Sequence, residues 1–107
     1  MDKAINKTIT EYIRQVQQKY PDFEAGYVFG SHAKGNPNQD SDIDLALIFK
    51  DLDGSNRFDF QVQLMLIASR IDSRIEPHPI SEKDFNSGNP FVTEIKKTGI
   101  EIVEKAV

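Results

Sequence analysis

The stretch from Ile43 to Phe49 constrains the fold more than any other part of the sequence, because it is apolar at every position except Asp44. A strand with one solvent-facing side alternates apolar and polar residues, whereas a continuously apolar strand must be covered on both faces. Residues 43–49 therefore predict a buried strand with helices packed around it. The expected fold class is mixed α/β (α+β).

Three segments around this strand have clear patterns of their own. Residues 2–20 carry apolar side chains at spacings of three and four and end before Pro21, which predicts an amphipathic helix. Residues 23–29 are rich in aromatic and apolar side chains and stop at Gly30, which predicts a strand that runs into a tight turn. Residues 51–56 are mostly polar and predict a loop.

Residues 57–71 permit two interpretations. Between Phe58 and Leu64 the apolar and polar side chains alternate, which is the period of a strand. The apolar run then continues as far as Ile71 without a turn residue, and this length favours a buried helix. We adopt the helix.

The last third of the chain predicts one strand at a sheet edge, two short helices and a final strand. Two prolines within residues 75–80 exclude a helix there and favour an edge strand. Ser81 and Asn89 are typical helix N-caps, and residues 100–103 can return as a strand. The prediction is a small mixed β-sheet with flanking helices, in a single domain over residues 1–107.

Composition narrows the possible functions. With 13 Lys and Arg against 17 Asp and Glu, the formal net charge is −4, which argues against direct nucleic-acid binding because that needs a basic face. The lack of cysteine excludes disulfides, thiolate zinc sites and cysteine nucleophiles. No apolar run approaches the roughly 18 residues of a membrane span, and the opening residues lack the apolar core of a signal peptide. We therefore expect a cytoplasmic protein with no membrane partner.

The stretch from Gly30 to Asp44 contains the residues that predict chemistry. A Gly30-Ser31 turn follows one predicted strand, and after ten further residues Asp42 and Asp44 stand two apart at the start of the next strand. Side chains two apart on a strand share a face, so two carboxylates would lie close together and repel each other unless a cation lies between them. Hard oxygen ligands of this kind suit Mg²⁺, which also binds substrate phosphates. Glycine allows close approach of a ligand to the backbone, and a serine at such a turn can bind phosphate oxygens.

Three other interpretations of this stretch are weaker. A P-loop needs Lys and then Ser or Thr where Asn36 and Pro37 stand. An EF-hand needs a glycine where Leu45 stands. Aspartates before a strand are often solvated turn residues, and we prefer that reading for Asp40. It fits Asp44 poorly, because an unpaired charge inside an apolar strand would cost several kcal/mol, to order of magnitude.

These residues resemble the signature of the minimal nucleotidyltransferases of the DNA polymerase beta superfamily, which is a Gly-Ser turn, ten residues and an Asp-x-Asp pair. Gly30, Ser31, Asp42 and Asp44 match it position by position. The family carries a third acidic residue on the following strand, where Glu76 stands in this chain.

The resemblance covers nearly the whole chain, since residues 90–95 and 98–102 look like the family's last helix and strand. Two residues depart from the common pattern. Glu76 replaces an aspartate that many members have, and Lys34 stands where arginine is frequent, so the positive charge is kept without the bidentate fork.

The resemblance implies transfer of a nucleoside monophosphate from a nucleoside triphosphate, such as AMP from ATP, to an acceptor hydroxyl. Asp42, Asp44 and Glu76 would be the catalytic residues and would hold two Mg²⁺ ions, and Glu76 would also accept the proton of the attacking hydroxyl. Gly30 and Ser31 would bind the β and γ phosphates. Such chemistry depends mainly on positioning and on stabilisation of charge.

The resemblance also suggests a partner. A chain of 107 residues leaves little material for a second substrate-binding domain, so the acceptor would be presented by another protein. Small members of this family often act as antitoxins that transfer AMP to a tyrosine of a helical HEPN-domain protein. The alternative is a catalytically degenerate module of the same fold that binds a nucleotide or a partner without turnover.

Three basic residues near the motif have simpler explanations. Lys34 in a polar loop is typically solvated, and His32 is a weak candidate for a role in the site. His78 shares a strand face with Glu76 and could relay a proton, but a histidine between two prolines more often has a structural role.

Overall fold

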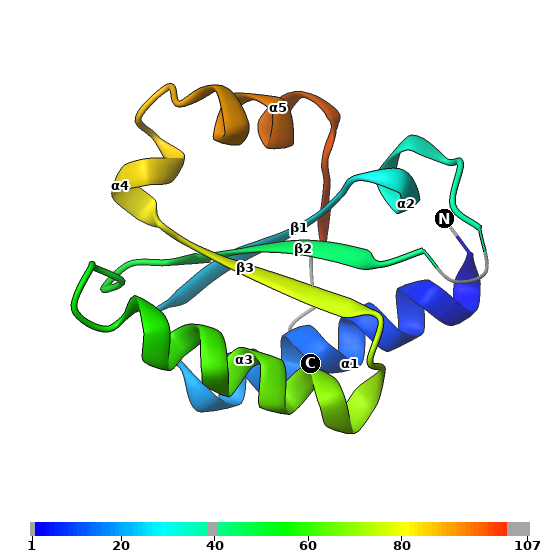
Figure 1. The fold of residues 1–107 in the computed structure, drawn as a ribbon, viewed down its shortest axis with the longest axis horizontal. Helices are drawn as coiled ribbons and strands as arrows, with labels where there is room; N and C mark the ends of the chain where they lie inside the picture. Colours follow the sequence, from blue (N-terminus) through cyan, green and yellow to red (C-terminus); the bar gives the residue numbers. More distant parts are fainter. Residues whose placement is uncertain (1, 39–40, 103–107) are drawn as a thin grey trace.

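The computed structural model describes residues 2–38 and 41–102 (Figure 1). Helices and strands alternate along most of the chain, as the sequence predicted. In chain order the elements are α1 (Lys3–Lys19), β1 (Phe23–Phe29), α2 (Ser31–Lys34), β2 (Ile43–Phe49), α3 (Arg57–Ile71), β3 (Ile75–Ser81), α4 (Glu82–Phe85), α5 (Pro90–Thr98) and β4 (Ile100–Ile102).

The four strands form one mixed sheet in the order β3-β2-β1-β4. β1 is antiparallel to both β2 and β4, whereas β2 and β3 are parallel. Parallel neighbours cannot be joined by a tight turn, and α3 supplies the crossover between them. β2 lies inside the sheet, and all its residues except the half-buried Asp44 are buried, which confirms the prediction made from its apolar run.

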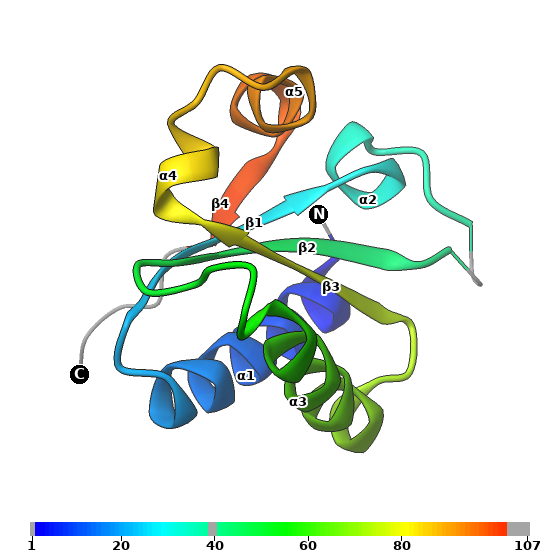
Figure 2. The same ribbon diagram turned by 60° about the vertical axis from the view of Figure 1, so that its left-hand side comes forward.

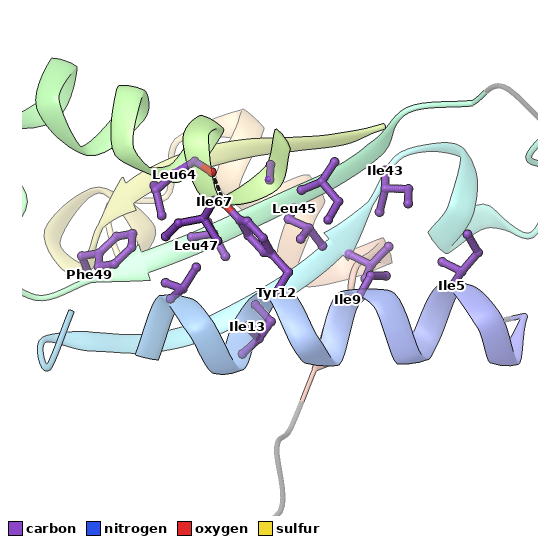
Figure 3. Close-up of a cluster of buried hydrophobic side chains, with 14 of the residues drawn as sticks. Ile5, Ile9, Tyr12, Ile13, Ile43, Leu45, Leu47, Phe49, Leu64 and Ile67 are labelled. Atoms are coloured by element: carbon purple, nitrogen blue, oxygen red, sulfur yellow. Dashed lines mark hydrogen bonds between the residues drawn. The ribbon is translucent and has the colours of Figure 1, made fainter. Parts of the chain in front are cut away.

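α1 and α3 cover one face of the sheet (Figures 1 and 2). Their apolar sides pack on alternate residues of β2, including Leu45 and Leu47. Tyr12 of α1 is buried in this layer, and its hydroxyl donates a hydrogen bond of 2.9 Å to the backbone carbonyl of Leu64 in α3 (Figure 3). The hydrogen bond joins the two helices across the core.

The opposite face of the sheet is covered over only part of its length. α4 and α5 lie above it (Figure 2), and a smaller core forms there from Ala46, Ile48, Ile80, Val92 and Ile95. α2 lies on the same side of the sheet, next to the end of β1 (Figure 1). The start of β2 and the start of β3 carry half-buried and exposed side chains on this face.

β3 forms one edge of the sheet, as its prolines predicted. The carbonyl of Pro77 accepts a hydrogen bond from the Gln61 side chain at 3.1 Å, and that of Pro79 accepts one from Arg57 at 3.0 Å. Both donors belong to α3. The two prolines have no amide hydrogen to offer on this side, and side chains already occupy their carbonyls.

One expectation needs correction, and part of another lies outside the described residues. α3 is a helix, as we inferred, but it is buried on one side only, and its other side exposes Phe58, Val62, Met65 and Leu66. This exposed apolar side explains why the segment also has the pattern of a strand. The last strand ends at Ile102 among the described residues, and Val103, which we included in it, lies outside them.

Among residues 2–38 and 41–102, no helix combines the length and the apolar character that crossing a bilayer requires.

Candidate active site

One row of residues across the sheet holds the centre of the candidate site. In the strand register, Asp44 of β2 lies between Phe29 of β1 and Glu76 of β3. These side chains share the partly covered face with Ala46 and His78, which form part of the next row. The third acidic residue predicted from the sequence therefore comes to lie beside Asp44, because β2 and β3 are parallel and in register. Asp42 precedes β2 by one residue.

The carboxyl group of Glu76 is affected by its acidic neighbours. The pKa of Glu76 is raised above its usual range, first because its protonated carboxyl donates a hydrogen bond to Asp42, then because of the negative charge of Asp42, burial and the charge of Asp44. His78 partly offsets this effect. The pKa shift of Glu76 thus reports a concentration of negative charge to which Asp42, Asp44 and Glu76 all contribute.

Gly30 brings the turn after β1 against Asp44. Its φ of 76° is one that residues with a side chain rarely adopt. A Cβ at this position would lie 2.6 Å from Oδ2 of Asp44, closer than atoms can approach without displacement. Only glycine therefore allows the turn and the carboxylate to occupy these places together. Ser31 follows as the first residue of α2 and is half-buried.

His78 belongs to the same site. Its Nε2 lies 3.2 Å from Oδ1 of Asp44, so the aspartate in the apolar strand has a partner within the chain. The imidazole ring packs edge-on against Phe29, with 5.1 Å between ring centroids. Phe91, at the start of α5, lies 5.6 Å from Phe29 and 6.4 Å from His78, again between centroids.

The donor atoms of the site fit a hard divalent cation. Asp42, Asp44 and Glu76 supply carboxylate oxygens, which Mg²⁺ prefers, and the hydrogen bond to Asp42 together with the charges of Asp42 and Asp44 raises the pKa of Glu76. Glu76 interacts with Asp42, whereas Asp44 contacts His78. Within the described part of the chain, no three His, Cys, Asp or Glu side chains form a group arranged to hold one ion.

The remaining predicted residues lie as follows. Lys34 is exposed at the end of α2. His32 is buried, and its Nε2 lies 3.3 Å from the carbonyl of Ser41, which fits a structural role. His78, for which a structural role was preferred, contacts Asp44. Asp40 lies outside the described residues.

Sequence reasoning missed Phe29 and Phe91 as parts of this site. Phe29 is the last residue of a strand, and Phe91 is the second residue of α5. Neither stands in a motif, and only the packing of α5 over the sheet brings the two rings together beside His78. The one available signal was an apolar residue in the first turn of a helix, and such residues are common.

Solved structures with the same fold include nucleotidyltransferases and toxin–antitoxin complexes. A candidate nucleotidyltransferase from Sulfolobus solfataricus is 25% identical, with a TM-score of 0.66 over 94% of this chain and 80% of the other. A chain of a toxin–antitoxin complex with AMP-PNP is 24% identical, with a TM-score of 0.61 over 94% of this chain and 73% of the other.

A third structure is the complex of a tri-AMPylated HEPN toxin with an MNT antitoxin from Shewanella oneidensis. The identity is 21% and the TM-score 0.54, over 98% of this chain and 74% of the other. Because these two toxin–antitoxin chains are less than 25% identical to this one, they bear on the fold alone. No curated protein sequence matches the chain.

The family model described as polymerase beta, nucleotidyltransferase matches residues 11–106. This range contains every residue of the candidate site, and the four-stranded mixed sheet with flanking helices is the arrangement that the resemblance implied. The chain belongs to the polymerase beta nucleotidyltransferase family.

Proposed function

We propose that this protein is a Mg²⁺-dependent nucleotidyltransferase that acts in the cytoplasm and transfers AMP from ATP to a hydroxyl group of another protein. The observation that carries the proposal is the position of Asp44 opposite Glu76 in the strand register, with Asp42 one residue before β2 and with the turn at Gly30 packed against the Asp44 carboxylate. Family membership gives the reaction class.

Each residue has a role in this proposal. Asp42, Asp44 and Glu76 would hold two Mg²⁺ ions, which when bound would neutralise phosphate charge and activate the acceptor oxygen. Gly30 and Ser31 bind the β and γ phosphates, because the backbone of a glycine turn can come close to a ligand. His78 fixes the orientation of Asp44 through their contact of 3.2 Å.

The transfer itself makes one bond and breaks one. The acceptor oxygen attacks the α phosphorus, the bond between that phosphorus and the oxygen bridging to the β phosphate breaks, and pyrophosphate leaves. Glu76, on the strand at the sheet edge, accepts the proton of the acceptor hydroxyl. The side chains of the site contribute positioning and charge stabilisation, which dominate this type of chemistry.

We infer that the acceptor is a tyrosine hydroxyl of a helical HEPN-domain protein, as in a toxin–antitoxin pair. The support is a similar fold in a complex of a tri-AMPylated HEPN toxin with an MNT antitoxin. The small size of the chain agrees with an acceptor that a partner brings to the site.

Incubation with Mg²⁺, ATP labelled at the α phosphate and the HEPN-domain protein encoded beside this chain tests the proposal. Label is expected on the partner, and its mass should increase by one or more AMP units. The variants Asp42→Asn and Asp44→Asn should each reduce labelling more than about 100-fold, because each removes one charge from the proposed metal site.

Asp59→Asn is the matched control, since this exposed aspartate lies on α3 away from the site. It should label its partner at the rate of the unmodified protein. Unchanged labelling in Asp42→Asn or Asp44→Asn would refute the assignment of these residues. Binding of ATP without any transfer would instead identify the protein as a degenerate binding module of the same fold.

A further inference from the structure

We propose that the aromatic group formed by Phe29, His78 and Phe91, with the groove that adjoins it, is the subsite for the base of the nucleoside triphosphate, and that the base stacks on Phe91. This inference rests on the proposed function and names the part of the substrate that the acidic residues and the Gly30 turn leave unassigned.

Phe91 presents a flat apolar surface to solvent in a fixed position. Its side chain is 49% exposed, although it already contacts Phe29 on one edge. Its backbone amide donates a 2.8 Å hydrogen bond to the Asn89 side chain, which caps α5. The residue is therefore anchored through its backbone and through Phe29, while much of its ring surface remains open for a ligand.

A groove with a volume of about 280 Å³ lies beside this ring. It runs between the start of α5, β3 and the start of α3, and Phe91, His78 and Val92 form part of its wall. Arg57 and Asp84 line it as well and form an ion pair of 3.4 Å. The lining combines apolar residues with hydrogen-bonding side chains such as Gln61 and Asn89, and a flat heteroaromatic ring can contact both kinds of group.

The groove is connected to the reacting centre through His78. This residue lines the groove and also contacts Asp44. In any nucleotide a ribose separates the base from the α phosphate, so a base site must lie a short distance from the carboxylates. Phe91, whose ring centroid is 6.4 Å from that of His78, is placed in this way.

The chemical groups that a nucleoside triphosphate needs also lie close to one another. The Gly30 turn and His78 both adjoin the Asp44 carboxylate, and Phe91 offers an aromatic surface next to His78 and Phe29. Stacking on an aromatic side chain is favourable for every base. The subsite thus contributes affinity for the nucleoside whichever base it carries.

Isothermal titration calorimetry with two probes tests the inference. One probe is ATP with a methylene group between the α and β phosphates, which cannot be cleaved there, and the other is inorganic tripolyphosphate, which has no base. Both are titrated in the presence of Mg²⁺. Phe91→Ala should weaken binding of the nucleotide about ten-fold or more, as expected from loss of one base–aromatic stack, and leave binding of tripolyphosphate unchanged.

Three further variants exclude a simple loss of packing. Phe91→Tyr keeps the flat ring and should retain nucleotide affinity. Phe91→Leu keeps an apolar side chain against Phe29 but loses the flat ring, and should behave like Phe91→Ala. Phe58→Ala removes a phenylalanine on α3 that is 77% exposed, and it should change the affinity for neither probe.

The results separate this inference from the proposed function. If the unmodified protein binds neither probe, the proposed function fails. If it binds both and Phe91→Ala binds both equally well, the base lies elsewhere and the inference is overturned. An unchanged nucleotide affinity together with a raised KM for the protein acceptor would assign the groove to the acceptor, which also overturns it.

Discussion

Gly30 and Gly88 both have a positive φ and differ in their surroundings. Their φ angles are 76° and 79°, both in the region that favours glycine. A Cβ on Gly30 would meet the Asp44 carboxylate at 2.6 Å, whereas a Cβ on Gly88 would meet nothing within 4 Å. Gly88 thus favours glycine only because of its φ, whereas Gly30 requires glycine also because there is no space for a side chain.

Alanine should lower stability at both positions, whereas it should lower activity only at Gly30. Both Gly30→Ala and Gly88→Ala place a side chain at positive φ, which costs about 1–2 kcal/mol of unfolding free energy. Only Gly30→Ala displaces the Asp44 carboxylate, and it should reduce AMP transfer about 100-fold. Urea unfolding and the transfer rate measure the two effects. Equal activity of the two variants would show that the contact with Asp44 is unimportant.

Single site residues could be proposed from the sequence where a motif specifies them. The types and spacing of Gly30, Asp42, Asp44 and Glu76 have a direct chemical meaning, and in the structure Asp44 lies next to Gly30 and opposite Glu76 in the strand register. His78 could not be assigned in this way, since its contact with Asp44 depends on the register of two strands that are 34 residues apart at these positions.

Among the elements, α3 shows how tertiary context decides an ambiguous pattern. It connects two parallel strands, and such a connection requires a crossover, most often a helix. Leu64, Ile67 and Ala68 face the core, while Phe58 and Met65 are exposed. Exposed apolar residues blur the amphipathic period, so neither the strand nor the helix pattern is clean in the sequence.

A buried hydrogen bond joins α1 and α3, and a substitution can remove it while the side chain keeps nearly the same shape. Tyr12→Phe deletes the hydroxyl that donates to the carbonyl of Leu64, and it should lower the unfolding free energy by about 1 kcal/mol. Urea unfolding monitored by circular dichroism measures the change.

Tyr27→Phe is the control for this substitution. Tyr27 is half-buried on β1, and its hydroxyl has no hydrogen bond to another described residue. Its removal should change the unfolding free energy by less than about 0.5 kcal/mol. If the unfolding free energy fell equally in the two variants, the hydrogen bond of the Tyr12 hydroxyl would contribute nothing to stability.

In the molecule as a whole, the two faces of the sheet have different roles. The face under α1 and α3 is closed by the larger core, and the opposite face is closed by α4 and α5 over only part of its length. The uncovered part carries the concentrated negative charge. The core on one side of the sheet therefore supplies most of the stability. On the other side, repulsion between negative charges remains, and a bound cation can reduce it.

Mg²⁺ should accordingly stabilise the folded protein in the absence of nucleotide. At a concentration ten times its Kd, a ligand that binds only the folded state adds about 1.4 kcal/mol, which corresponds to several degrees in Tm for a chain of this size. Differential scanning calorimetry at constant ionic strength measures the shift. It should be reversed by EDTA, reduced in Asp44→Asn and retained in Asp59→Asn. A shift of equal size in Asp44→Asn would place the ion elsewhere.

The fold class could be predicted from the sequence because the relevant signals are local. The continuous apolar run of β2, the spacing in α1 and the prolines of β3 each allow few alternatives. The strand order and the half-open face could not be predicted from these patterns, since they depend on contacts between distant segments. For the same reason the aromatic group around Phe91 emerged only once α5 was placed over the sheet.

The prolines of β3 also limit how this molecule can associate with others. Extended chains join a sheet by matching amide hydrogens with carbonyl oxygens along its border. Pro77 and Pro79 offer no such hydrogens, and Gln61 and Arg57 already occupy their oxygens. Fibril-like stacking and strand exchange between copies are thus disfavoured at the border next to the acidic residues, which leaves it accessible to a substrate.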